Sequence, residues 1–266
     1  MSRRRLSGPG QGIGAHTHQG TLAAVMDFPE TPDIETSSDA YAARFSGDVG
    51  SWFLKVQEEA TLRMLAPFPN ATVLDVGGGH GQLTDALVRN GYAVTVLGSS
   101  DQCKVRLQKL IDEKFCTFNV GNILELPYQN QSFDVVVSYR ILPHVVQWRH
   151  LTSELARVAQ KAVIVDYPIL RSVNYIAPLL FRFKKHVEGN TRPFTVFKES
   201  EIIETFKSYN FTATDRFPEF CLPMALYRAL KSYRFALWAE KLCRSTGLTH
   251  VFGSPVILKL VRRTGL

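Results

Sequence analysis

The sequence predicts an α/β fold with a doubly wound, mainly parallel sheet of seven strands, an N-terminal helix and a C-terminal helical cap. Two observations predict it. Short apolar runs alternate with segments of helical periodicity between residues 71 and 167, and a cluster of four glycines follows the first apolar run. Strands that alternate with helices form βαβ units, whose strands lie parallel with helices on both faces of the sheet. The 266 residues, 45% of them hydrophobic, are enough for one such core.

The chain is expected to begin with an arm and a helix. Residues 1–38 are rich in Arg, Gly, Ser and Pro and lack an apolar run of signal-peptide length, so they predict a disordered arm and a cytoplasmic protein. Residues 51–65 carry apolar side chains at helical spacing, and Pro67 and Pro69 end this N-terminal helix.

The elements of the sheet follow in order. The core, residues 71–167, is predicted to hold strands 71–76, 93–97, 116–120, 133–138 and 162–165, with helices 83–88, 102–111 and 151–159. Beyond Pro168 the pattern predicts helices 173–186, 198–207 and 223–243 and strands 211–217 and 255–261. Two late strands separated by a long insertion are compatible with an antiparallel hairpin on the sheet edge. A single domain, 39–266, would then carry its helical cap at 171–245 and its closing strand at 255–262.

Basic charge is concentrated in the C-terminal third. Residues 171–266 contain 16 Lys and Arg against 7 Asp and Glu, whereas the whole chain has a net charge of +7. This bias suits an anionic substrate, peripheral contact with an anionic membrane or nucleic acid, and it suits a solvated basic face at least as well. No run approaches the roughly 18 apolar residues of a spanning helix. The four cysteines form no CxxC pair or Cys/His cluster, so no metal site is predicted.

The most informative segment is VLDVGGGHGQL, residues 73–83. An apolar strand runs into Asp75, then into four glycines within five positions, and then into a helix. Glycines let the backbone lie directly against a ligand, and the N-terminus of the following helix presents unpaired N–H groups. A dinucleotide fingerprint that starts at Gly77 would need Gly or Ala at position 82, where this chain has Gln82. The loop therefore predicts a nucleotide-cofactor site that is not built for NAD.

With this loop and the segment LELPYQNQSFDVVVSYRILPHV, residues 124–145, the chain resembles the class I methyltransferases that use S-adenosylmethionine (SAM), and most closely their small-molecule, type 11-like group. The resemblance covers residues 41–166, about half the chain. It implies a Rossmann-like methyltransferase fold, SAM as the cofactor, and a methionine site formed by the acid Asp75 and the glycines Gly77, Gly79 and Gly81. It also places Ile123 and Tyr139 at the cofactor site.

Two positions depart from the family's pattern. Gly98 stands where an acid usually binds the ribose hydroxyls, which leaves Ser99 and its neighbours as the alternative contacts. Asn122 stands where an Asp usually accepts a hydrogen bond from the adenine amino group, and an amide oxygen can accept the same bond. Because of these departures, a relative of this family that binds SAM weakly or has lost catalysis is an alternative interpretation of the chain.

Two residues are candidates for the chemistry. SAM carries an activated methyl group, so the protein mainly has to hold a nucleophile in line with it. His144, in the LPHV segment after the fourth strand, is the candidate general base, and a structural role in the following turn is an equal alternative. Tyr41, in YAARFSGDVGSWF, resembles the aromatic segment that closes over SAM in relatives, and ordinary packing is its alternative.

The sequence thus predicts an enzyme that methylates a small, lipophilic or anionic metabolite. A nucleic-acid methyltransferase is the first alternative, but the fourth strand is followed by SYRILP and not by the Asn/Asp-Pro-Pro-aromatic signature of amino-methylating enzymes. A non-catalytic binding or scaffold protein is the second, because a fold alone does not carry function. The methyl acceptor and the oligomeric state are not readable from one chain.

Overall fold

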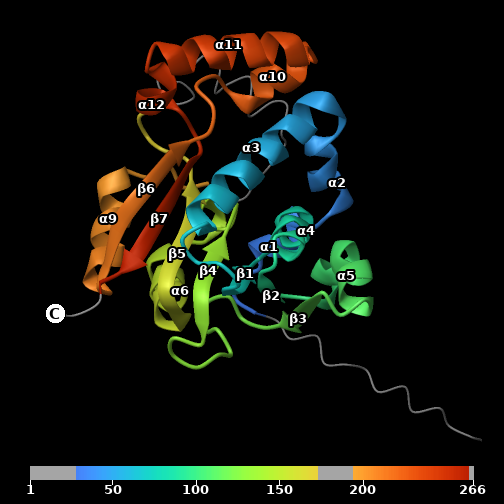
Figure 1. The fold of residues 1–266 in the computed structure, drawn as a ribbon, viewed down its shortest axis with the longest axis vertical. Coiled ribbons are helices and arrows are strands. Elements are labelled where there is room, and N and C mark those ends of the chain that lie inside the picture. The colour runs from blue at the N-terminus through green and yellow to red at the C-terminus, as the bar shows by residue number, and fades with distance from the viewer. Residues whose placement is uncertain (1–27, 173–193, 264–266) are drawn as a thin grey trace, which may run out of the picture.

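A computed structural model of the chain describes residues 28–172 and 194–263, which fold into an α/β structure around one sheet (Figure 1). The strand order is β3-β2-β1-β4-β5-β7-β6. Strands β1 to β5 pair in parallel, whereas β7 is antiparallel to both β5 and β6. The predicted seven-stranded, mainly parallel sheet is confirmed, and its last two strands make it mixed. The strands are β1 (Thr72–Val76), β2 (Ala93–Gly98), β3 (Cys116–Val120), β4 (Phe133–Ser138), β5 (Ala159–Tyr167), β6 (Phe211–Pro218) and β7 (Val256–Arg262).

Helices cover both faces of the sheet. One buried apolar cluster joins α3, α4 and η2 to the sheet, and another joins α6 and α9 to the opposite face. Both clusters include strand residues with no exposed surface, among them Leu74 and Val73, whose side chains alternate between the faces. The helices on these faces are α3 (Gly47–Leu65), α4 (Gln82–Arg89), η2 (Asp101–Leu107), α5 (Gln108–Asp112), α6 (Trp148–Val158) and α9 (Glu199–Ser208).

A third apolar cluster lies away from the sheet. It packs Phe45, Phe53 and Phe220 against Tyr227 and joins the start of α3 to α10 and α11. Helices α10 to α12 gather at the end of the molecule toward which β6 runs (Figure 1). These elements are η1 (Ala43–Phe45), α10 (Met224–Leu230), α11 (Tyr233–Ser245) and α12 (Leu248–Phe252). In the two described ranges, no helix combines the length and apolarity that crossing a bilayer requires.

The structure differs from the expected elements in two places. Residues 28–38 were assigned to a disordered arm, but they include α1 (Pro32–Thr36), with α2 (Asp39–Ala42) following, and Asp33 is fully buried. Polar contacts hold this segment, so apolar periodicity does not reveal it. The helix expected over 223–243 is broken, because Lys231 takes a left-handed φ of 50° and Ser232 caps the next helix through its side chain. The helix expected at 173–186 lies outside the described residues.

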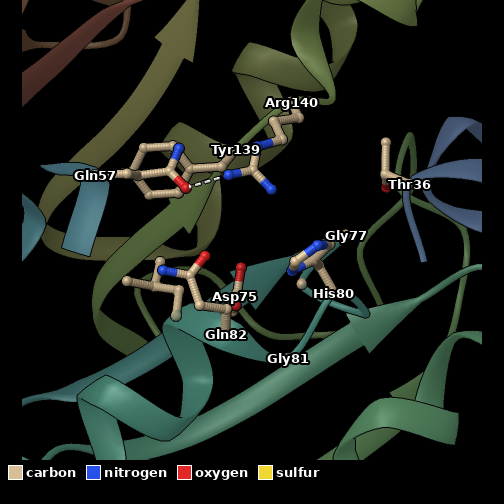
Figure 2. Close-up of a pocket in the computed structure, with 11 residues that line it drawn as sticks. Thr36, Gln57, Asp75, Gly77, His80, Gly81, Gln82, Tyr139 and Arg140 are labelled. Carbon is tan, nitrogen blue, oxygen red and sulfur yellow. Dashed lines mark hydrogen bonds between the residues drawn. The ribbon is translucent and has the colours of Figure 1, made fainter. Parts of the chain in front are cut away.

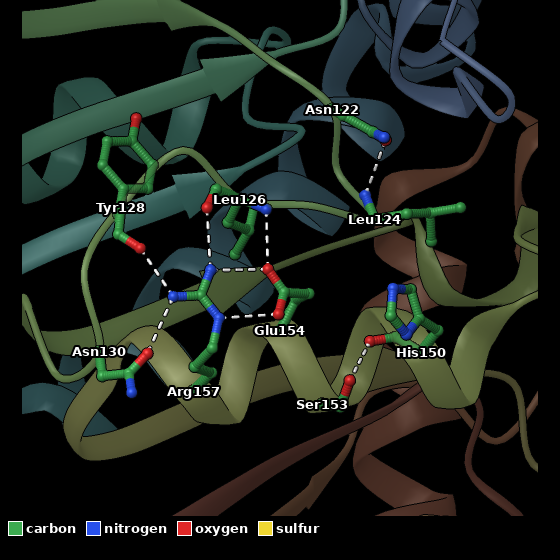
Figure 3. A network of polar contacts seen from close by, with 9 residues as sticks. All are labelled: Asn122, Leu124, Leu126, Tyr128, Asn130, His150, Ser153, Glu154 and Arg157. Atoms are coloured by element: carbon green, nitrogen blue, oxygen red, sulfur yellow. Dashed lines mark hydrogen bonds and ion pairs between the residues drawn. The ribbon is translucent and has the colours of Figure 1, made fainter.

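The connection between β3 and β4 is held against α6 by one arginine (Figure 3). The guanidinium of Arg157 donates to the carbonyl oxygens of Leu126 and Tyr128 at 2.8 and 2.7 Å and pairs with Glu154 at 2.7 Å. Glu154 in turn accepts the N–H of Leu126 at 2.8 Å. This network fixes the segment that begins with Asn122 at the carboxyl end of β3.

Candidate functional site

The glycine loop lies at the centre of the sheet, between β1 and α4. β1 lies between β2 and β4, and the chain order reverses there, so the loop sits at the topological switch point where open α/β sheets bind ligands. Gly77 and Gly81 take left-handed φ values of 78° and 79°, which side chains rarely adopt. The N–H of Gly77 donates to the carbonyl of Leu97, which ties the loop to β2. The predicted loop is therefore a tight backbone turn that opens at the carboxyl edge of the sheet.

Asp75 lies directly beneath the loop. Its side chain is buried, and Oδ2 accepts a hydrogen bond from Thr84 Oγ1 at 3.3 Å. Burial raises the pKa of Asp75 to about 7, although the Thr84 bond and the positive charge of Arg140 act in the opposite direction. In the described parts of the chain, no Lys or Arg nitrogen lies within 4 Å of this carboxylate. A buried carboxylate with no cation close to it is stabilised most by a cationic ligand group, such as an ammonium group.

A pocket opens above the loop (Figure 2). Its walls combine the loop with residues from α1, α3 and the end of β4. The residues that line it are Thr36, Gln57, Asp75, Gly77, Gly78, His80, Gly81, Gln82, Leu83, Tyr139 and Arg140. Of the predicted cofactor contacts, Asp75, Gly77, Gly81 and Tyr139 are therefore brought together at one pocket.

Arg140 enters this pocket from the end of β4. Its backbone takes a left-handed φ of 62°, an uncommon conformation for a residue with a side chain. The guanidinium donates to Gln57 Oε1 at 2.7 Å (Figure 2). It also lies 4.3 Å from the ring centroid of Phe45. A guanidinium has five N–H donors. No carboxylate of the described residues lies within 4 Å of it, so it can bind an anionic group of a ligand.

His80 occupies the position between the last two glycines of the loop. Both of its ring nitrogens are buried and lack a hydrogen-bond partner among the described residues. Burial, together with Arg140 and Arg106, lowers the pKa of His80 to about 4, so the imidazole is neutral at neutral pH. Its ring stands edge-on to the rings of Phe45 and Tyr41, with centroids 5.5 and 6.4 Å away. A neutral imidazole with two unused nitrogens is available to a ligand in the pocket.

Two further carboxyl groups lie at the same edge of the sheet. Asp166, near the end of β5, accepts the backbone N–H of Arg140 at 2.6 Å, and burial raises its pKa to about 6. Glu219 follows β6 directly and is buried, and Oε1 lacks a hydrogen-bond partner in the described structure. Burial, and next the charge of Asp166, raise the pKa of Glu219 to about 8. Together with Asp75, they place three buried acids around one arginine.

The predicted ribose and adenine contacts do not line the pocket. A side chain at Gly98 would meet Cys103 and Phe118, with Cβ 2.8 and 2.9 Å from their nearest atoms. Ser99 is buried and its N–H and hydroxyl both donate to Asp33. Asn122 Oδ1 accepts the N–H of Leu124 at 2.9 Å, so its amide oxygen already has a local donor. Ile123 is fully buried in the apolar core. Gly98, Ser99, Asn122 and Ile123 are therefore not among the residues that line this pocket.

The remaining predicted residues differ in how close they lie to the glycine loop. The hydroxyl of Tyr139 lies 2.7 Å from Thr61 Oγ1, and burial raises its pKa well above the usual value. Tyr41 stands beside His80, and burial raises the pKa of its phenol. His144, in η3 (Leu142–His144), has its ring 5.6 Å from that of Phe194 and does not line the pocket. Tyr41 is therefore near the loop, whereas His144 is not brought to it.

Sequence reasoning missed the residues that come from distant segments, namely Asp33, Gln57, Arg140, Asp166 and Glu219. One signal was present for two of them: Arg140 and Asp166 follow or end apolar strands, and the carboxyl ends of parallel strands share one edge. Asp33 gave no signal, because it lies in a polar segment far from the loop in sequence.

Comparisons with known proteins agree with this geometry. Residues 74–165, about a third of the chain, match a family model described as a methyltransferase domain. A ubiquinone biosynthesis O-methyltransferase of Paramagnetospirillum magneticum is 36% identical over 85 residues, 31% of this chain. The match spans only 33% of that relative's length.

Solved structures share the fold. The structure of magnesium protoporphyrin IX methyltransferase from Synechocystis with bound S-adenosylhomocysteine (SAH) superimposes with a TM-score of 0.59 at 17% identity, over 86% of this chain and 97% of that one. A Burkholderia thailandensis 1,6-didemethyltoxoflavin-N1-methyltransferase, with its substrate and SAH bound, gives a TM-score of 0.53 at 13% identity, over 79% of each chain. The glycine loop lies within residues 74–165, which match the methyltransferase domain model, and the described fold is similar to those of solved methyltransferases.

Proposed function

We propose that the protein transfers a methyl group from SAM to a small-molecule acceptor. The observation that carries this proposal is the glycine loop at the switch point of the sheet, with the carboxylate of Asp75 buried beneath it. The loop lies in the segment that matches the methyltransferase family. The proposal is also supported by the three relatives that share the match or the fold, because each of their names contains a small molecule.

The residues present fit the methionine part of SAM. Gly77 and Gly81 line the pocket with loop backbone, and Asp75 offers a buried carboxylate to the ammonium group. Arg140 offers unused N–H donors to a carboxylate in the same pocket. SAM supplies the activated methyl group, and the task of the protein is to bind and orient both partners and to exclude water.

The acceptor is proposed to bind beside Arg140. The guanidinium there supports an acceptor with an anionic group, and the aromatic rings of Tyr41 and Phe45 support an apolar or planar body. Asp166, with a pKa of about 6, is mostly ionised at neutral pH and can take up a proton from a hydroxyl acceptor if the acceptor reaches it. Tyr41 and His144 remain candidate catalytic residues, of which Tyr41 is closer to the loop.

Methyl transfer can be tested without knowing the acceptor. Purified protein is incubated with SAM and pooled phenols, carboxylic acids and amines, and SAH formation is measured. The proposal expects turnover with at least one small-molecule pool, and loss of that turnover in Gly79→Arg. Turnover only with RNA or DNA would replace the small-molecule acceptor by a nucleic acid. No SAH from any pool, in a protein that binds SAM, would contradict the proposed reaction.

Peripheral contact with an anionic membrane is a separate proposal, which α11 supports. Phe235, Trp238 and Leu242 recur at helical spacing and are 38%, 62% and 49% exposed. Exposed Arg234 and Lys241 lie on the same helix, which suits anionic headgroups. Sedimentation with vesicles tests it: binding to vesicles with 30% anionic lipid and not to neutral ones is expected, and Trp238→Gln should weaken it. Equal binding of the variant would count against this face.

A further inference from the structure

The N-terminal segment crosses the cofactor edge of the sheet. Residues 30–39, here called the strap, contain α1 and the start of α2. At one end the carboxylate of Glu30 accepts the N–H groups of Val146 and Gln147 at 2.6 and 3.0 Å. At the other end Arg106 of η2 donates to the carbonyl of Ser37 and pairs with Asp39. Between these anchors the strap passes over the carboxyl ends of β4, β1 and β2.

The middle of the strap fills the space beside the glycine loop. A Cβ on Gly79 would stand 2.1 Å from Ser37 Oγ. A Cβ on Gly77 would meet Ile141 first, at 2.5 Å, and would stand 3.4 Å from Asp33 Cβ. A glycine loop of this kind is bare so that a ligand can lie directly on its backbone. At Gly79 that place is taken by the chain's own Ser37.

Asp33 carries the contact with β2. Its Oδ2 accepts the N–H of Ser99 and its Oδ1 accepts the Ser99 hydroxyl, both at 2.6 Å. The thiol of Cys103 lies 3.4 Å from Oδ2. Asp33 is fully buried, and no Lys or Arg nitrogen of the described residues lies within 4 Å of it. A buried carboxylate held only by neutral donors is a costly arrangement, which another ligand for Ser99 can replace.

β2 ends in a glycine at the position where an acid would be expected to bind a ribose. In nucleotide-binding α/β folds, an acid about 20 residues after the glycine loop binds the ribose hydroxyls, and Gly98 stands at that distance from Gly77. A side chain at position 98 would meet Cys103 and Phe118, with Cβ 2.8 and 2.9 Å from their nearest atoms. This structure therefore has no room for an acid at position 98, and the carboxylate that lies at the end of β2 is that of Asp33.

We propose that the strap occupies the ribose half of the cofactor site and must leave before SAM binds, so that the strap regulates access of the cofactor. This inference rests on the proposed function. In this proposal the strap and SAM compete for the same space. A strap that stays in place and offers Asp33 to the ribose would instead favour SAM binding.

The contacts that hold the strap are mainly polar, which favours its displacement. Its buried residues in α1 are Pro32, Asp33 and Thr36, of which only one is apolar, and no residue of 30–39 belongs to the three apolar clusters described above. Neutral and charge-assisted hydrogen bonds of the kind that hold it contribute modestly to net stability. The hydroxyl oxygens of a ribose can accept the N–H of Ser99 in place of Asp33, so the exchange leaves no buried donor unpaired.

Titration of the full chain with SAH tests the competition. Asp33→Ala removes the central anchor, and its affinity for SAH is expected to rise at least about tenfold. Asp39→Ala removes an exposed end anchor and is expected to raise the affinity about twofold. Asp85→Ala, on the exposed side of α4, is the matched control and should leave the affinity unchanged. Lower affinity in Asp33→Ala would overturn the proposal, because Asp33 would then be supporting the ligand.

Hydrogen exchange of the unaltered protein gives a second test that does not depend on variants. With saturating SAH, amides of residues 30–39 are expected to exchange faster while those of 77–83 exchange more slowly. Slower exchange in both segments would contradict displacement but would leave the proposed function standing. Absence of any SAH binding, in the unaltered protein and in Asp33→Ala alike, would contradict both.

Discussion

The carboxylate of Asp75 lies so close beneath Gly78 that a Cβ on Gly78 would stand 2.1 Å from Asp75 Oδ2. Position 78 must therefore be glycine for the acid to sit where it does. The acid and the loop form one unit, in which glycine backbone lies directly over a buried carboxyl group. The predictions that follow test this unit and its supports.

The first prediction concerns pH. Because the pKa of Asp75 is about 7 without a cationic neighbour, an ammonium-bearing ligand such as SAH binds the ionised form and releases a proton. Affinity for SAH is expected to fall as the pH drops below 7, approaching about tenfold per pH unit. Asp75→Asn should bind more weakly, and without this slope. Calorimetry at pH 5.5 to 8 measures both, and a slope that survives in Asp75→Asn would assign it to another group.

The second prediction separates the site from backbone strain. Gly81 and Gly91 both take left-handed φ values, 79° and 83°, but only Gly81 lines the pocket. Alanine at either position should lower the free energy of unfolding by about 1 kcal/mol. Only Gly81→Ala is expected to weaken SAH binding. Equal affinities for the two variants, by titration of folded protein, would show that the loop is not the binding surface.

The third prediction concerns stability. Glu219 has a pKa of about 8 in the folded protein, against about 4.3 in an unfolded chain. Between these values the folded state holds a proton that the unfolded state has lost, so this group's contribution is present at low pH and is lost as the pH rises. Glu219→Gln should therefore be more stable than the unaltered protein at pH 8, by on the order of 1 kcal/mol or more, and less so at pH 5.

Urea denaturation at pH 5 and pH 8 measures whether Glu219→Gln raises the free energy of unfolding more at the higher pH. Glu59→Gln, at an exposed position on α3, is the control and should shift neither value by more than about 0.5 kcal/mol. A Glu219→Gln effect of the same size at pH 5 and pH 8 would mean that the carboxyl does not titrate in this range.

The fourth prediction concerns Arg157. Its guanidinium holds the backbone of the β3–β4 connection, so Arg157→Gln should cost about 1–3 kcal/mol of unfolding free energy. Burial raises the pKa of Glu154, but the hydrogen bonds from Arg157 and Leu126 lower it by more, so that the pKa lies below its usual value. Arg89→Gln, which removes exposed pairs on α4, should cost less than about 0.5 kcal/mol. If Arg157→Gln and Arg89→Gln lower the free energy of unfolding by similar amounts in chemical denaturation, Arg157 has no special role in holding this connection.

Most of the fold could be predicted because its signals are local. The strands that end at Val76, Ser138 and Tyr167 each contain a short run of apolar residues, and a glycine cluster marks where the first one turns. The break at Lys231 could not be predicted, because a left-handed lysine leaves no mark in the apolar pattern.

The candidate site could be predicted in part for the same reason. Asp75, Gly77 and Gly81 are close in sequence and line one pocket, whereas Gly79 is not among its lining residues. Asp33 and Glu219 reach that edge from the two ends of the chain through long-range contacts, which no spacing rule connects to the loop. The contact between Asp33 and Ser99 at the end of β2 is of this long-range kind.

Calorimetric titration with SAH, repeated on Gly79→Arg with Gly91→Ala as the folded control, tests the central claim most directly. A cofactor site at the glycine loop predicts saturable micromolar binding by the unaltered protein and by Gly91→Ala, and none by Gly79→Arg. If neither the unaltered protein nor Asp33→Ala binds SAH up to millimolar concentration, the account is wrong, and the fold serves a function other than methyl transfer.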